Sequence, residues 1–241
     1  MRTLQKTKHN MDERLSLIDH LNEVRTRLLK SVVFVIIISC VLYSIIDILV
    51  PMLAKPVKRL IFIAPQEAFM VNIKIAFLAG LFFSSPYLLY QIWEFVSVGL
   101  EKKERKYVLI FGLLSFVLFI FGCSFGYFII LPIAMKFLLG FATDYISPMI
   151  TVSKYVSFVG TIIFAFSFVF QLPLIMLFLT KIGIVTPVFL SKKRRHAIVG
   201  MFVVAAILTP PDVITQCLMA GPLLILYEIG IMFSKWAYRP A

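Results

Sequence analysis

Long runs of apolar residues alternate along the chain with short segments that carry charge or proline. Four of the runs are long enough for helices that cross a membrane core of roughly 30 Å. The fifth run is short, since its 12 residues 197–208 reach only about 18 Å at about 1.5 Å per residue. The sixth is interrupted by Gln216 and Gly221-Pro222, so the last two runs predict either a pair of short spans or a re-entrant hairpin. The predicted spans are about 31–50, 68–92, 108–131, 156–180, 197–209 and 213–233.

The composition excludes a water-soluble enzyme. Hydrophobic residues make up 61% of the chain and charged residues 15%, with a mean hydropathy of +0.97. A soluble domain is nearer half apolar and a quarter charged. We therefore expect an all-α integral membrane protein in which residues 1–241 form a single membrane domain. Its three histidines are too scattered for a metal site, and no catalytic motif is present, so we predict no catalytic residue, no metal and no cofactor.

The positive charges predict the orientation in the membrane. The chain has 24 Lys and Arg against 12 Asp and Glu. In a six-span arrangement, 18 of the 24 fall in the arm 1–30, the loops 94–107 and 181–196 and the C-terminal tail. By the positive-inside rule, both termini are then cytoplasmic. No basic stripe interleaved with aromatic residues accompanies the charge, so the expected partner is the lipid bilayer and not nucleic acid.

Two cytoplasmic segments combine charge with a possible recognition role. The arm 1–30 has an apolar helical face, which predicts an amphipathic helix at the membrane surface. It is either a positive anchor or a binding face, and Glu23 favours the second. The loop 94–107 mixes glutamates with lysines and arginines, which is typical of a solvated turn. Carboxylates in both segments would also suit a ligand with adjacent guanidinium groups, because Arg–carboxylate bonds can be bidentate.

Several polar and small residues lie within the predicted spans. Lys74 and Glu228 are near span ends, where their side chains can extend to the interface. Gln171 and Gln216 lie deeper, and either a functional role or a hydrogen bond between helices accounts for them. The pair Gly122 and Gly126 permits close helix packing, within the chain or between copies. Kinks are expected at four prolines, Pro86, Pro132, Pro173 and Pro222.

Four motifs, in this order along the chain, resemble those of the TatC family, the multispanning subunit of the twin-arginine protein translocase. They are LIDHLNEVRTRL (17–28), SSPYLLYQIWEFVSVGLEKKERKY (84–107), FGYFIILP (125–132) and the LTPPDVITQ and GPLLILYEIG segments (208–230). The resemblance covers about residues 15–236. It implies six spans with the last two short, in a curved receptor-like bundle of the cytoplasmic (inner) membrane.

The resemblance also implies a function and partners. The family binds the twin-arginine signal peptides of folded precursor proteins and assembles with the single-span subunits TatA and TatB. Self-association within the complex is expected, and transport is driven by the proton-motive force without ATP hydrolysis by this chain. The positions that match the family's signal-peptide site are Glu23, Arg25, Phe95 and Glu104. Positions matching functional or partner-contact residues are Pro56, Gln171, Asp212 and Gln216.

The sequence departs from the family pattern at two places. The family commonly has glutamate where this chain has Gln171, so an essential ionisation there is in doubt and a polar contact suffices. Val98-Gly99 replaces a more usual small-Pro-small pattern. Two other functions stay open: a transporter or channel for a small solute, which needs a midplane site often made of broken helices, and a passive assembly scaffold without cargo recognition.

Overall fold

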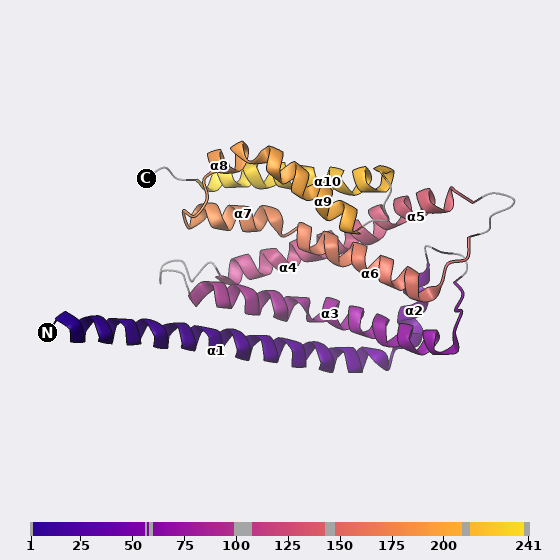
Figure 1. Cartoon of the computed structure of the whole chain (residues 1–241). Helices are drawn as coiled ribbons and strands as arrows, with labels where there is room; N and C mark the ends of the chain where they lie inside the picture. Colours follow the sequence, from indigo (N-terminus) through magenta and orange to yellow (C-terminus); the bar gives the residue numbers. More distant parts are fainter. Residues whose placement is uncertain are drawn as a thin grey trace. The chain divides into compact units, whose positions relative to one another are not determined.

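The chain is helical through most of the residues that the computed structural model describes, which are 2–55, 57, 60–98, 108–142, 148–208 and 213–238 (Figure 1). For residues 2–21, 97, 98, 108 and 208, only the backbone is described. The helices are α1 (Arg2–Tyr43), α2 (Ile46–Ala54), α3 (Pro65–Val98), α4 (Val108–Phe125), the π-helical turn η2 (Gly126–Ile130), α5 (Leu131–Leu139), α6 (Val152–Val169), α7 (Leu172–Lys181), α8 (Pro187–Lys192), α9 (Arg194–Leu208) and α10 (Val213–Ala237).

Five helical stretches in the described residues are long and apolar enough to cross a membrane: Asn22–Tyr43, Pro65–Val96, Leu109–Leu139, Val152–Lys181 and Val213–Ala237. The prediction of an all-α protein with several apolar helices is thereby confirmed. The helix α9 has 15 residues, fewer than the roughly 20 of an ordinary span. In the described part of the chain, β-pairing amounts to an isolated parallel bridge between Ile61 and Thr151.

The first predicted span differs from the structure in one respect. Residues 31–50 are covered by two helices, because α1 ends at Tyr43 and α2 begins at Ile46. The last carbonyls of a helix have no partner within it. At the end of α2, two hydroxyls from distant helices take that place. Tyr127 donates to the carbonyl of Met52 at 2.7 Å, and Tyr155 donates to the carbonyl of Leu53 at 2.9 Å.

Two of the four prolines lie next to an irregularity in the helices. Pro132 follows the π-helical turn Gly126–Ile130, and Pro173 follows a break at Phe170 and Gln171. Proline lacks an N–H and its ring clashes with the carbonyl four residues earlier, which accounts for both irregularities. In contrast, α3 and α10 continue as helices through Pro86 and Pro222.

The helices form two compact units. The first contains Met1–Ser44 and Ala76–Gly112, and so joins α1 to the C-terminal part of α3. The two helices run antiparallel. Ser39 packs on Gly80, where an added Cβ would lie 2.9 Å from the Cα of Ser39. The ring centroids of Phe34 and Tyr87 are 4.5 Å apart. A side chain at position 80 would therefore force α1 away from α3.

The second unit contains Ile45–Ile75 and Leu113–Ala241. Its centre is the crossing of α4 and η2 with α6, where Gly122 and Gly126 face the backbone of α6. The glycine pair therefore packs within the chain, which confirms one of its two predicted uses. Phe166, only 1% exposed, fills the interface beside it. Helix α7 packs along α10, and Thr180 and Ser234 share a hydrogen bond of 2.5 Å between them (Figure 1).

Candidate functional site

A cluster of polar side chains joins α1 to α3 in the first unit, with the guanidinium of Arg27 at its centre. Its Nε and Nη2 atoms both donate to Oε1 of Glu23, at 3.1 Å and 2.6 Å. Its Nη1 atom donates to Oε2 of Glu94 at 2.9 Å and to Oε1 of Gln91 at 3.1 Å. The amide of Gln91 in turn donates to the hydroxyl of Tyr87 at 2.7 Å. One guanidinium thus holds acceptors from two helices.

Helical spacing explains how these residues come together. Glu23 and Arg27 are four residues apart on α1, and Tyr87, Gln91 and Glu94 are separated by four and three residues on α3. Residues at these separations lie on the same face of a helix. The close approach at Gly80 and the ring contact at Tyr87 bring the two faces together. The cluster is thus an outcome of the packing of α1 on the C-terminal part of α3.

The cluster is partly shielded from solvent. The side chain of Arg27 is 20% exposed, and those of Glu23 and Glu94 are 33% and 40% exposed. Glu23 and Glu94 both accept hydrogen bonds from the guanidinium of Arg27. Partial burial strengthens charge-assisted hydrogen bonds relative to those on an open surface.

The other predicted residues of this region are placed differently. Arg25 is exposed and lies two positions from both Glu23 and Arg27 on α1, so it points to another side of the helix. Phe95 is half-buried and follows Glu94 on α3. Glu104 lies outside the described residues. Sequence reasoning missed the role of Arg27, although its four-residue spacing from Glu23 was a usable signal.

Gln171 occupies the break between α6 and α7 in the second unit. Its side chain is buried at 7% exposure, and its Nε2 atom donates to the backbone carbonyl of Ser115 on α4 at 3.0 Å. The break precedes Pro173, so the sequence places a polar side chain where the helix is already interrupted. The contact is a hydrogen bond between helices, which is one of the two roles expected for this residue.

Replacing Gln171 by leucine should destabilise the protein modestly. The change removes the bond to Ser115 at similar side-chain volume, and such bonds between membrane helices contribute about 0.6–2 kcal/mol. The corresponding decrease in Tm is roughly 1–8 °C, measured by thermal unfolding in detergent. The control is Phe168→Leu on the exposed side of α6, which should change the stability by less than about 0.5 kcal/mol. Equal effects of both variants would contradict the assigned role of the hydrogen bond.

Only some of the remaining predicted positions lie within the described residues. Gln216 on α10 donates from Nε2 to the carbonyl of Phe202 on α9 at 3.0 Å, so it connects the last two helices. Pro56 and Asp212 lie outside the described residues. Lys74 donates to the hydroxyl of Ser157 at 2.6 Å, so this lysine has a protein partner in addition to any contact with the interface.

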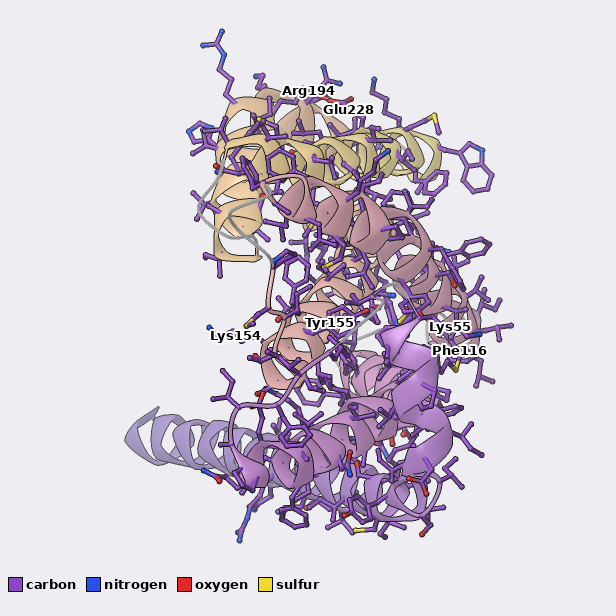
Figure 2. The ribbon with its side chains drawn as sticks, turned by 90° about the vertical axis from the view of Figure 1, so that its right-hand side faces the viewer. Lys55, Phe116, Lys154, Tyr155, Arg194 and Glu228 are labelled. Atoms are coloured by element: carbon purple, nitrogen blue, oxygen red, sulfur yellow. The ribbon has the colours of Figure 1, made fainter. Side chains whose placement is uncertain are left out.

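Glu228 on α10 is also paired, with Arg194 at the start of α9. The distance from Nη2 of Arg194 to Oε2 of Glu228 is 2.8 Å, and both side chains are about half exposed (Figure 2). This ion pair connects the beginning of α9 to α10 within the second unit. Over the described ranges, no group of three or more His, Cys, Asp or Glu side chains could hold a metal ion.

Comparison with known proteins identifies the family. The model of the Sec-independent protein translocase protein (TatC) family matches residues 19–222. The chain belongs to the TatC family. The assignment of the four motifs to this family is therefore confirmed. TatC proteins are membrane-embedded subunits of a protein translocase, a family that is not a family of catalytic enzymes.

Individual TatC proteins are similar over nearly their whole length. The chain is 42% identical over 230 residues to TatC of Carboxydothermus hydrogenoformans, covering 93% of this chain and 95% of that protein. It is 38% identical over 240 residues to TatCy of Bacillus subtilis, covering 94% and 91%. A crystal structure of the twin-arginine translocase receptor TatC superimposes with a TM-score of 0.83 at 39% identity, covering 91% of this chain and all of that one.

Proposed function

We propose that this TatC protein binds the twin-arginine signal peptides of folded precursor proteins and serves as the scaffold on which the export complex assembles. The single-span subunits TatA and TatB are its partners, and copies of the chain associate within the complex. Transport is driven by the proton-motive force. The similarity to a solved TatC that is described as a translocase receptor supports a receptor role.

The proposed topology has six spans and both termini in the cytoplasm, with the protein in the cytoplasmic (inner) membrane. Five spans correspond to the five long apolar helices, and the short helix α9 is the remaining one. The distribution of basic residues supports this orientation, because 18 of 24 fall on the proposed cytoplasmic side. The arm, the loop 94–107 and the tail then face the cytoplasm, where precursors arrive.

The proposed signal-peptide site contains Glu23, Arg25, Phe95 and Glu104. The observation that supports this proposal is that Oε1 of Glu23 accepts two hydrogen bonds from the guanidinium of Arg27, so this carboxylate is already in contact with a guanidinium group. The paired arginines of a signal peptide present the same chemical group. We assign their main contact to Glu104, with Glu23 as a second carboxylate and Phe95 as an apolar neighbour.

The proposed partner contacts lie elsewhere on the chain. Gln216 connects α9 and α10 at the face where a partner helix would pack, and Asp212 directly precedes α10. Pro56 precedes the segment that leads to α3, and we assign it to a cap-like loop on the outer side. For Gln171 we propose a polar contact in place of the acid that the family commonly has.

The test of the proposed function is crosslinking of a twin-arginine signal peptide to the full chain in membranes. The Glu104→Lys variant should crosslink far less, because a desolvated Arg–carboxylate contact contributes about 2–5 kcal/mol on truncation. At an exposed surface the loss would be under about 1 kcal/mol. The control is Glu228→Lys, which changes the charge equally at a carboxylate in the other unit.

Two results would contradict the proposal. Unchanged crosslinking by both Glu104→Lys and Glu23→Lys would indicate a passive scaffold without cargo recognition. Uptake of a small solute into liposomes that contain this chain alone would indicate a transporter instead.

A further inference from the structure

We propose that the C-terminal end of α10 carries a binding site for an anionic phospholipid, whose phosphate is held by Lys192, Arg194 and Lys235 and whose acyl chain lies along α10. Two cavities form the site, where α8 and α9 pack on α10 (Figure 1). One is lined by α10 and the start of α9 and has a volume of about 540 Å³. The other is lined by α8 and the end of α10 and has a volume of about 490 Å³. Lys235 lines both cavities, all these residues lie in the second unit, and the inference does not depend on the binding of a signal peptide.

The first argument is the charge around the two cavities, which favours an anion. The described residues that line them include three bases, Lys192, Arg194 and Lys235, and one acid, Glu228. The acid is paired with Arg194 at 2.8 Å (Figure 2). In the part of the chain that the structure describes, Lys192 and Lys235 are exposed and have neither a hydrogen bond nor an ion pair. Lysine is a common phosphate ligand, so a phosphate group would supply the partner that both ammonium groups lack.

The second argument is the apolar wall of the larger cavity, which favours a lipid over a soluble anion. The wall includes four apolar side chains of α10, Leu224, Ile225, Ile229 and Met232. Ile225 and Met232 are 63% and 59% exposed, and their spacing of seven residues places them on one face of the helix. From Ile225 to Lys235 the helix rises about 15 Å. This is half of a membrane core of roughly 30 Å, so the wall has the length of an acyl chain in one leaflet.

The third argument is the depth of the site in the membrane, which the aromatic residues beside Lys235 indicate. Trp236 is 86% exposed, and Tyr238, which lines the smaller cavity, is 42% exposed. Exposed tryptophan and tyrosine at the end of a span are typical of the headgroup region. At this depth a lysine can keep its methylene groups among acyl chains and extend its ammonium group to a phosphate. In the proposed topology this end of α10 is cytoplasmic, where anionic lipids attract basic residues.

The experiment measures which lipid the full chain retains in detergent. The purified chain is mixed with equal amounts of dioleoyl phosphatidylglycerol, which is anionic, and dioleoyl phosphatidylcholine, and the bound lipids are counted by native mass spectrometry. We expect Lys235→Gln to lower the ratio of bound phosphatidylglycerol to phosphatidylcholine about fivefold, the effect of one basic residue near an anionic surface. The matched control is Arg195→Gln, which removes the same charge from an exposed side chain that lines neither cavity. Equal losses in the two variants would overturn the site and indicate a diffuse attraction to the basic surface.

Lys192 is tested in the same way, because it lines only the smaller cavity. Lys192→Gln should also lower the ratio of bound phosphatidylglycerol to phosphatidylcholine, and the double variant with Lys235→Gln should retain the two lipids about equally. Both lysines are exposed, so the variants should fold as the unaltered chain does. An undiminished preference for phosphatidylglycerol in the double variant would overturn the proposal.

Two further ligands separate a lipid site from a site for free phosphate. Dihexanoyl phosphatidylglycerol has the same headgroup on short chains and should bind at least about tenfold more weakly, because each buried CH₂ group contributes to binding. Inorganic phosphate in excess should leave the dioleoyl lipid bound. Displacement of the dioleoyl lipid by inorganic phosphate, or equal binding of the two phosphatidylglycerols, would overturn the lipid assignment and indicate a phosphate site.

Discussion

Replacing Gly122 by leucine should force α4 and α6 apart and strongly destabilise the folded protein. A Cβ atom at this position would lie 2.6 Å from the carbonyl oxygen of Phe166 and 2.7 Å from the Cα atom of Ser167. Both are backbone atoms, so no side-chain rotation relieves the overlap and the helices must separate. We expect the free energy of unfolding to decrease by about 3 kcal/mol or more. This lowers the Tm by roughly 6–12 °C.

The measurement is thermal unfolding of the purified chain in detergent, together with the amount that accumulates in membranes. The matched control is Gly200→Leu on α9 in the same unit, because an added Cβ there has no heavy atom within 4 Å. The substitution is identical, and helix propensity favours leucine over glycine at both positions. A similar Tm for the two variants would show that the contact between α4 and α6 tolerates a side chain.

Lengthening α9 should abolish export without preventing insertion into the membrane. The helix has 15 residues, which span about 22 Å at about 1.5 Å per residue, against a membrane core of roughly 30 Å. A short span thins the bilayer around it or needs partner helices to cover its ends. Four leucines inserted after Ile207 extend the apolar length by about 6 Å and reduce this mismatch. We therefore expect export of a twin-arginine reporter to fall at least tenfold.

The control carries a tetrapeptide of serine and asparagine at the same point. It adds the same number of residues and changes the connection to α10 equally, but it leaves the apolar length unchanged. Export should be retained better by this control than by the leucine variant. Both are assayed in cells whose only copy of the subunit is the variant, with membrane content measured by immunoblot. Normal export by the leucine variant would exclude a role for the short helix.

Much of the fold follows from the sequence because membrane helices are specified locally. The apolar runs predicted an all-helical membrane protein, and the described residues contain five long apolar helices. Pro173 predicted the interruption at which Gln171 lies. The break at Ser44 and Ile45 was not predicted, since neither residue is a helix breaker. In the structure, the following helix is held by the hydroxyls of Tyr127 and Tyr155. Contacts from residues this far along the chain leave no trace in the local pattern.

The candidate site was predictable only in part, for a related reason. Glu23 stood out as an acid in a basic arm, but its bond with Arg27 forms part of a network that reaches Glu94, which is 67 residues from Arg27. That pairing requires the antiparallel packing of α1 on α3, which depends on Gly80. A sequence reading can identify each charged residue, but the register between two helices is set by small residues one to four turns away.

The bonds that hold the end of α2 also impose an order on biogenesis. The carbonyls of Met52 and Leu53 accept hydrogen bonds from tyrosines that come 75 and 102 residues later in the chain. At about 5–20 residues per second, a ribosome needs roughly 5–20 s to supply the second tyrosine after Leu53 has been made. A nascent chain therefore passes through a stage in which the end of α2 lacks these two hydrogen bonds and is accessible to proteases. Only the synthesis of α6 ends that stage.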